Sequence, residues 1–329
     1  MSEGSGVAVV TGATGFIGHA LSEALRAAGW MVRGVDVSPA DGVVPGDVSR
    51  PGAWARALVG ADVVVHAAAL VGMPFPRQPE RYWRVNVVGT RRVVEAARTA
   101  GARRLVLVSS VVVFGNDFPD QVDETYPVRP TGVPYADTKI AAEQVVLAAH
   151  AAGEVEVTVV RPGDVYGPRS VWVEQPLRLM RRATAVVPGS GRGVFSPVYL
   201  DDLVAGVLAA STTPGAAGRV LTLSGGVGVP AGEFFDHLGR LAGVPVPTVP
   251  TWSLGAAARV GGSAAALVGR SVALSPDVAH YIGDRRGTYS IERAGRLLGW
   301  KPAVTLEDGM ARVAQWARES GRLRTGGPR

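Results

Sequence analysis

The first half of the chain alternates short apolar, β-branched runs with longer amphipathic stretches. The runs expected to form strands are Val7–Val10, Met31–Asp36, Val43–Val48, Asp62–His66, Arg104–Ser109 and Val155–Arg161. Helical patterns lie between them, near Ile17–Gly29, Gln78–Ala100 and Tyr135–Ala152. Nearly continuous apolar strands are typical of a parallel sheet with helices on both faces. The pattern therefore predicts an α/β fold with a doubly wound parallel sheet.

The pattern loosens after Gly163, where Gly and Pro become frequent and strands no longer alternate cleanly with helices. We expect residues 1–163 to form a large domain and residues 193–212 to return to it. Residues 164–192 and 213–320 are expected to build a smaller lobe. The remaining tail, residues 321–329, is short and basic and is expected to be disordered.

A glycine-rich turn follows the first expected strand, in the segment TGATGFIG. Its glycines, Gly12, Gly15 and Gly18, are spaced three apart. Glycine permits a tight turn, a close approach of backbone to a pyrophosphate, and close packing of helix on strand. The helix that follows directs free N–H groups at the phosphates. A strand, this loop and a helix together predict a dinucleotide site.

Carboxylates end the next two strands of the predicted sheet. Asp36 closes the second strand, where a carboxylate accepts both hydroxyls of an adenosine ribose and repels the 2′-phosphate of NADP. Val37 follows it, so no adjacent cation offsets that repulsion. We therefore predict NAD as the cofactor. Asp47 and Val48 end the third strand and are expected beside the adenine, although for both aspartates a simple turn-capping role stays open.

Tyr135 and Lys139 lie four residues apart in a predicted helix, so their side chains share one face. A phenol with a pKa near 10 is a poor base at neutral pH, and a neighbouring ammonium is expected to lower that pKa. Among 34 basic residues only Lys139 and Lys301 are lysines, which indicates that a compact ammonium is needed here. The pair predicts a proton-transfer site.

Two serines end the strand LVLVSS. Ser109 and Ser110 fall at the carboxyl edge of the predicted sheet, where ligands bind in doubly wound folds. A hydroxyl there would hydrogen-bond a substrate oxygen and stabilise the charge that develops on it. We assign this role to Ser110, while capping of loop backbone remains an alternative for both serines.

Composition excludes several other classes of protein. With 329 residues and no cysteine, the chain has room for a large core and offers neither disulfides nor thiolate metal sites. The start MSEGSGVAVV has no signal-peptide pattern, so we expect a cytoplasmic protein. His66 stands alone at a strand end, and no metal is expected. The net charge is +6, but the arginines are scattered and no nucleic-acid motif occurs, so no nucleic-acid partner is expected.

No apolar stretch reaches the roughly 18 residues that a membrane span needs. The nearest, residues 251–269, contains Arg259 and many glycines. We therefore expect no integral membrane segment, and a packed helix is favoured for this stretch, with weak association with a membrane surface left open.

Together these motifs resemble the extended short-chain dehydrogenase/reductase family, which includes epimerases, dehydratases and 3β-hydroxysteroid dehydrogenases. The resemblance spans nearly the whole chain and is closest to the 3β-hydroxysteroid dehydrogenase-like branch. Nine landmarks occur in the family's order: TGATGFIG, Asp36, GDV, HAAAL, VNVVGT, VSSVVVFG, PYADTK, RPGDVYGP and VYLDDL. The resemblance implies a Rossmann-type domain and a substrate-binding smaller lobe.

The resemblance also implies roles for individual residues. Backbone N–H groups of Phe16 and Ile17 would meet the pyrophosphate, and Asn86 would support the site. Lys139 would bind ribose hydroxyls as well as assist Tyr135, the acid/base, whose partner is Ser110. The cofactor pocket would be completed by Ala67, Ala68 and Ala69 along the nicotinamide ribose and phosphates, and by Pro162 and Val165 beside the nicotinamide. A homodimer is implied through the helices near Arg81–Ala100 and Tyr135–Ala149.

The substrate is the least determined part of the prediction. The family's nucleotide-sugar members usually carry an arginine shortly before the DDL segment, where this chain has Phe195, with Arg192 nearby. An apolar lid is expected from Trp172, Val173, Leu177, Met180, Trp252 and Leu254. The leading hypothesis is interconversion of a secondary alcohol and a ketone on a steroid-like or polyketide-like molecule. The alternatives are a nucleotide-sugar epimerase or dehydratase, and a catalytically idle NAD-binding regulator.

Overall fold

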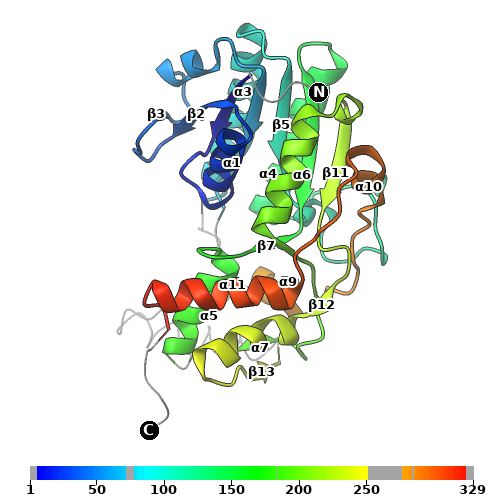
Figure 1. The fold of residues 1–329 in the computed structure, drawn as a ribbon. Coiled ribbons are helices and arrows are strands. Elements are labelled where there is room, and N and C mark those ends of the chain that lie inside the picture. Colours follow the sequence, from blue (N-terminus) through cyan, green and yellow to red (C-terminus); the bar gives the residue numbers. More distant parts are fainter. Residues whose placement is uncertain (1–5, 72–77, 183, 251–275, 284, 324–329) are drawn as a thin grey trace.

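A computed structural model describes residues 6–71, 78–182, 184–250, 276–283 and 285–323. Its centre is a seven-stranded sheet in the order β11-β6-β5-β4-β1-β2-β3 (Figure 1). All of its pairings are parallel. The strands are β1 (Val7–Thr11), β2 (Met31–Asp36), β3 (Val43–Pro45), β4 (Val63–His66), β5 (Arg104–Val108), β6 (Glu156–Pro162) and β11 (Arg219–Leu223). The predicted doubly wound α/β fold is confirmed.

Helices cover both faces of the sheet, as the apolar strands predicted. Successive residues of β1 point to opposite faces: Val9 joins one core, and Ala8 and Val10 join the other. One face is covered by α1 (Phe16–Ala27) and α6 (Leu200–Thr212), and the other by η1 (Ala53–Leu58), α3 (Gly89–Thr99) and α4 (Pro134–Ala151). The expected helix near Gln78–Ala100 is continuous but has three parts: α2 (Pro79–Tyr82), the π-helical η2 (Trp83–Val88) and α3.

One strand prediction and one domain assignment need correction. The third strand ends at Pro45 rather than Val48, because it pairs only with β2, which itself ends at Asp36. The edge strand β11 lies in the segment 213–320 that the sequence placed wholly in the smaller lobe, yet it pairs with β6 along its full length. Its apolar run is too short to reveal from sequence alone which sheet it joins.

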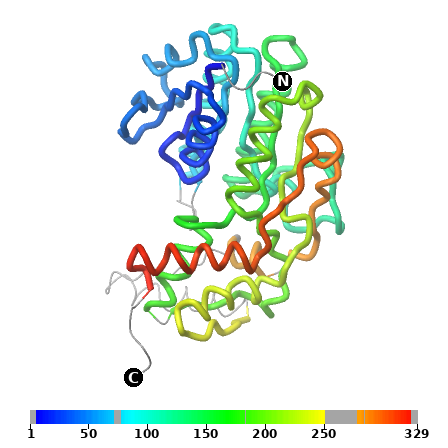
Figure 2. The backbone as a smooth tube through the Cα atoms, in the orientation of Figure 1, coloured from blue at the N-terminus to red at the C-terminus, as the bar shows by residue number. Residues whose placement is uncertain are grey.

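The smaller lobe lies at the carboxyl edge of the sheet, and Figure 2 shows the chain crossing between the two parts several times. Its core gathers aromatic and aliphatic side chains around Phe195 and Phe234, both fully buried. The helices are α5 (Val171–Arg181), α7 (Ala231–Ala242), α9 (Pro276–Gly283) and α11 (Leu306–Glu319), with α10 (Glu292–Leu298) beside β11. The short strands are β7 (Asp164–Tyr166), β8 (Val187–Pro188), β9 (Val194–Phe195), β10 (Pro197–Tyr199), β12 (Val229–Pro230) and β13 (Thr248–Val249), and the remaining 3₁₀ turns are η3 (Val111–Phe114) and η4 (Pro214–Ala216).

The first residues of the basic tail are held in place, contrary to the expectation of disorder from residue 321 onward. Gly321 follows α11 with φ +67°, and the N–H groups of Arg322 and Leu323 donate to the Ala317 carbonyl. Arg322 also forms an ion pair with Glu174 of α5, at 2.8 Å. A left-handed helix end and a charge partner order this segment, while residues 324–329 lie outside the described part of the chain.

Within the described ranges, no helix combines the length and apolar character needed to cross a membrane. The segment 251–269, for which surface association stayed open, lies outside the described residues. The assignment of the chain to the cytoplasm remains a prediction from the sequence.

The homodimer prediction gains a specific surface. Trp83 and Val88 are 46% and 41% exposed, and they lie five residues apart, about one turn of the π-helical η2. Tryptophan is enriched at protein interfaces, and both residues lie within the segment proposed for the dimer. We expect sedimentation at about twice the 34.1 kDa chain mass, and a shift to monomer in Trp83→Glu. Val227→Glu, at a valine 76% exposed in the loop between β11 and β12, is the control and should leave the mass unchanged. A wild-type monomer at micromolar concentration would contradict the prediction.

Candidate active site

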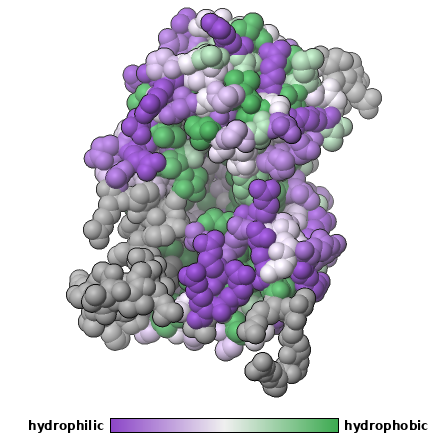
Figure 3. Space-filling view, turned by 90° about the vertical axis from the view of Figure 1, so that its left-hand side faces the viewer, coloured by the Kyte–Doolittle hydropathy of each residue, from purple (hydrophilic) through white to green (hydrophobic). Residues whose placement is uncertain are grey.

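A cavity of about 740 Å³ opens between the carboxyl edge of the sheet and the smaller lobe. In the space-filling view the molecule is hollowed at its middle, between these two parts (Figure 3). Most of the residues proposed from sequence line this cavity: Gly12, Gly15, Phe16, Ile17, Gly18, Ala67, Ala69, Ser109, Ser110, Tyr135, Pro162 and Val165. The structure thus brings the glycine loop, the serines and the tyrosine to one place.

The glycine loop is shaped by close backbone contacts. Gly12 has φ +74°, and a Cβ on it would lie 2.7 Å from the Ala68 nitrogen. A Cβ on Gly18 would lie 2.0 Å from the Gly12 carbonyl oxygen. Helix α1 begins directly after Gly15, and within the described chain no side chain caps it and no acid lies in its first turn. Its N–H groups therefore face the cavity without a competing anion, which fits a dinucleotide pyrophosphate.

Asp36 lies behind this loop, at the end of β2, and does not line the cavity itself. Its carboxylate accepts hydrogen bonds from the backbone N–H groups of Thr14, at 3.0 Å, and Ser38, at 2.9 Å. Each carboxylate oxygen keeps a further lone pair, so the group remains able to accept a ribose hydroxyl. The bond to Thr14 also ties β2 to the glycine loop, so Asp36 combines the proposed ribose contact with a turn-capping one.

The remaining cofactor-side predictions fall outside the cavity wall. Asp47 accepts from the N–H of Ser49, at 2.9 Å, and Val48 is 5% exposed within the core around Trp54. Ala68 crosses beneath Gly12, with its backbone nitrogen 3.4 Å from the Thr11 hydroxyl. Asp47 therefore caps a turn, and Val48 and Ala68 pack against neighbouring residues. A direct contact of these three residues with the cofactor stays a prediction.

Tyr135 and Ser110 meet at the cavity from different elements. Tyr135 stands in the first turn of α4, while Ser110 follows β5 and caps η3 through the N–H of Val112, at 3.3 Å. Burial raises the pKa of Tyr135 to about 12, and its hydrogen bond with the Ser110 side chain opposes that rise. The sequence analysis expected the neighbouring ammonium to lower this pKa. That expectation is wrong: burial dominates, and the group that opposes the rise is Ser110 rather than Lys139, so the phenol is protonated at neutral pH.

Lys139 lies one turn further along α4 and is buried, with only 4% of the residue exposed. Its Nζ donates to the Val108 carbonyl at 2.8 Å and lies 5.9 Å from the centre of the Tyr135 ring. Burial lowers the pKa of Lys139 to about 8, and the charge of Glu143 opposes that effect. Lys139 therefore remains a cation at neutral pH, directly behind the tyrosine.

Glu143 was missed by the sequence analysis, although it lies on the same helix four residues after Lys139. Its carboxylate accepts from the Ser109 hydroxyl at 2.6 Å and from the Arg161 guanidinium at 3.0 and 2.7 Å. Both charged side chains are buried, with 3% and 5% exposed. The repeated four-residue spacing on α4 could have indicated Glu143. Arg161 lies on strand β6, however, and only the fold brings it close to Glu143.

A second buried network fixes the neighbouring strand ends. The two ring nitrogens of His66 contact the hydroxyls of Thr11, at 2.7 Å, and Thr90, at 3.0 Å. Burial, aided by the charge of Lys139, lowers the pKa of His66 to about 3, so the ring is neutral. Asn86 continues the network: its side chain binds the Leu70 backbone and, at 3.0 Å, the Thr138 hydroxyl. Asn86 thus supports the site from behind rather than lining it.

The structure holds no cluster of three or more His, Asp or Glu side chains suited to a metal in its described ranges. The lid prediction is partly wrong. Trp172 lines the cavity, but Val173, Leu177 and Met180 point into the core of the smaller lobe, each at most 2% exposed, because α5 turns its apolar stripe toward α7. Trp252 and Leu254 lie outside the described residues.

Comparison with known proteins agrees with this geometry. Residues 8–223 match the model of the NAD dependent epimerase/dehydratase family. The chain belongs to this family. As a member, it is an NAD-dependent enzyme of the extended short-chain dehydrogenase/reductase type, and NAD is its cofactor. This matches the glycine loop and the carboxylate at Asp36.

Individual proteins resemble the chain over almost its whole length. Human sterol-4-alpha-carboxylate 3-dehydrogenase, decarboxylating, is 28% identical over 96% of this chain and 89% of that enzyme. A 4-hydroxy-2-methyl-3-oxo-4-farnesyl-3,4-dihydroquinoline-1-oxide ketoreductase of Stigmatella aurantiaca is 32% identical over 93% and 95%. Among solved structures, MoeE5 in complex with UDP-glucuronic acid and NAD is 29% identical over 96% and 100%, with a TM-score of 0.78.

The preference of the enzyme for NAD over NADP tests whether Asp36 contacts the adenosine ribose. Asp36→Ala should weaken NAD binding more than NADP binding, because it removes the ribose acceptor and the repulsion of a 2′-phosphate together. Dissociation constants for both cofactors, measured by calorimetry, check this. Asp41→Ala, at an exposed aspartate on the same loop, should leave both constants unchanged. Wild-type protein that binds NADP as tightly as NAD would show that Asp36 does not face the ribose.

A substitution at Glu143 tests how much the buried Glu143–Arg161 ion pair, next to Lys139 on α4, stabilises the fold. Glu143→Gln leaves the Arg161 cation buried without its partner, and loss of one member of such a pair typically costs about 3–5 kcal/mol of unfolding free energy. Denaturant unfolding should show that loss. Glu292→Gln, which breaks an exposed pair with Arg296 at 3.6 Å, should change stability little. Equal losses of unfolding free energy in the two variants would mean that the buried Glu143–Arg161 pair does not stabilise the fold.

Proposed function

We propose that this enzyme interconverts a secondary alcohol and a ketone on a hydrophobic small molecule, with NAD. The observation that carries the proposal is the composition of the cavity in front of Ser110 and Tyr135. Apart from the cofactor segments, its walls include a set of apolar side chains, Val71, Val112, Val133, Val171, Trp172 and Val278, beside polar and charged ones. Such walls favour an apolar substrate body, which a few polar groups then orient.

The site's own residues account for the proton. When bound, NAD supplies the acceptor or donor of the hydride. Ser110 hydrogen-bonds the substrate oxygen and holds it beside Tyr135. In ketone reduction the protonated phenol gives its proton to that oxygen, and in alcohol oxidation the phenolate takes it back. Lys139 stabilises the phenolate by its positive charge, and the hydrogen bond to Val108 with the charge of Glu143 keeps the ammonium in place.

Relatives support an apolar substrate. The names of the human and Stigmatella enzymes describe a sterol dehydrogenase and a farnesyl-quinoline ketoreductase. A steroid-like or polyketide-like molecule therefore remains the leading substrate class. An intact Ser110–Tyr135 contact with a lysine behind it also argues against a catalytically idle NAD-binding regulator, because such a protein needs no proton carrier.

A nucleotide-sugar epimerase or dehydratase is the second candidate, since MoeE5 was solved with a UDP-sugar acid. The position before the DDL segment weighs against it. Phe195, where the nucleotide-sugar relatives usually place an arginine, is fully buried and packs on Phe234 with ring centres 4.4 Å apart. Arg192 is exposed and does not line the cavity.

The two candidates differ in the fate of the hydride. A dehydrogenase releases NADH in proportion to ketone, whereas an epimerase returns the hydride within each cycle. Incubation with NAD and a panel of hydrophobic secondary alcohols should give NADH absorbance equal to the ketone formed. Epimerisation of a UDP-sugar without NADH, and no turnover of any alcohol, would reject the proposal.

Tyr135→Phe tests the proton carrier. The variant keeps the ring, so NAD binding should persist, while turnover should fall by about 10²–10⁴-fold. Lys139→Ala should impair both, because the ammonium serves the phenol and the proposed ribose contact. Calorimetry with NAD and steady-state rates separate the two effects. Full activity in Tyr135→Phe would overturn the mechanism.

The pH dependence follows from the raised pKa of Tyr135. Its phenol stays protonated below pH 8, so kcat for ketone reduction should stay level there, and it should fall above about 8 as Lys139 loses its charge. Alcohol oxidation needs the phenolate, so its kcat should rise from pH 6 to 8. Rates in buffers of constant ionic strength check this. Oxidation that is faster at pH 6 than at pH 8 would contradict the assignment.

A further inference from the structure

The charged side chains around the cavity do not balance. Four of them line it: Asp164, Arg169, Glu174 and Arg178. Asp164 is neutralised from behind by the fully buried Arg285, whose Nη2 lies 2.5 Å from its carboxylate. Glu174 pairs with Arg322 through two contacts, at 3.0 and 2.8 Å. Both acids are thus paired with arginines that do not line the cavity, and two cations remain.

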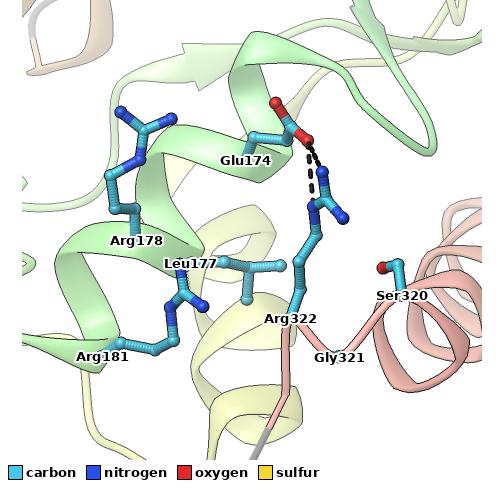
Figure 4. A pocket seen from close by; sticks show the side chains of 7 residues that line it. All are labelled: Glu174, Leu177, Arg178, Arg181, Ser320, Gly321 and Arg322. Atoms are coloured by element: carbon cyan, nitrogen blue, oxygen red, sulfur yellow. Dashed lines mark hydrogen bonds and ion pairs between the residues drawn. The ribbon is translucent and has the colours of Figure 1, made fainter.

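Arg178 has no acidic partner among the described residues. It lies on α5 one turn after Glu174, and Figure 4 shows Glu174 turned toward Arg322 while the Arg178 side chain extends away from that pair. Because Arg322 already occupies the Glu174 carboxylate, the guanidinium of Arg178 keeps its donors available to a ligand. Arg178 is exposed, and an arginine with available donors at the wall of a cavity is suited to a planar anion such as a carboxylate.

Arg169 adds a second cation to the same wall. It also has no acidic partner in the described part of the chain, and its backbone is left-handed, with φ +70°. That conformation is costly for a residue with a Cβ and is concentrated at ligand sites. The loop between β7 and α5 therefore holds Arg169 at the cavity against a backbone cost.

We propose that the substrate carries a carboxylate that binds Arg178, with Arg169 adding positive charge beside it. The substrate is then a hydroxy or oxo acid with an apolar body. This inference rests on the proposed function, because it names the chemical class of the molecule on which Ser110 and Tyr135 act. It separates this enzyme from a nucleotide-sugar enzyme, whose substrate would bring a diphosphate instead.

The chain offers a matched control for the test. Arg181 leaves the same helix three residues later and faces only a neighbouring surface pocket with Arg178 and Arg322 (Figure 4). Decanoate, decanol and UDP serve as probes, titrated by calorimetry into the NAD complex of each protein. Charge-assisted hydrogen bonds are strong enough that decanoate should bind at least about ten-fold more tightly than decanol.

Arg178→Gln should abolish the preference for decanoate, Arg178→Lys should retain part of it, and Arg181→Gln should leave it unchanged. Thermal unfolding confirms that the variants are folded. Equal binding of decanoate and decanol to the wild type, or no binding of decanoate, would overturn the inference. The inference would also be overturned if UDP bound more tightly than decanoate and if Arg178→Gln weakened the binding of UDP. A different result would reject the proposed function: no NADH would form when the enzyme and NAD are incubated with hydrophobic secondary alcohols, whether or not these carry a carboxylate.

Discussion

The buried ion pair between Glu143 and Arg161 joins helix α4 to the sheet at the point where the chemistry is placed. Glu143 also receives the Ser109 hydroxyl, so α4, β5 and β6 meet in one hydrogen-bonded cluster. Two buried charges are stable only with close partners, which fixes the rotation of α4 relative to the strand ends. Tyr135 and Lys139 stand on the same face of α4, two turns and one turn before Glu143, and they inherit that rotation. The position of Tyr135, the proposed proton carrier, therefore depends on an ion pair that does not line the cavity.

A second buried pair has a similar effect on the substrate side. Asp164 follows the end of β6 and binds Arg285, the Tyr281 hydroxyl and the Ser196 N–H. These contacts join β7 to the residue before β10, to α9 and to the segment after α9. The cavity is thus enclosed by elements from distant parts of the sequence, and its acids are neutralised from outside. The remaining cavity wall combines apolar side chains, uncharged polar ones such as Asn116, Thr131 and Gln175, and the two arginines Arg169 and Arg178.

The sequence was informative wherever a local pattern carries the chemistry. The glycine spacing, the four-residue Tyr135–Lys139 spacing and the serines at a strand end each follow from one element and the parallel sheet. It was uninformative about ion pairs between side chains of different elements. Arg161, Arg178 and Arg322 look alike in a chain with so many arginines, and only the fold shows which are paired. The segment that contains β11 was assigned to the smaller lobe for the same reason, because its short apolar run does not show which strand it pairs with.

The most direct test of the central claim follows the hydride itself. The substrate is a secondary alcohol deuterated at its carbinol carbon, preferably an apolar hydroxy acid. The enzyme oxidises it with NAD, and mass spectrometry measures the deuterium content of both products. The account predicts that the deuterium appears on NADH, one atom for each ketone formed, and that Tyr135→Phe suppresses the transfer. Deuterium retained in an epimerised product, or lost to water, would contradict the assignment of this site to alcohol–ketone interconversion.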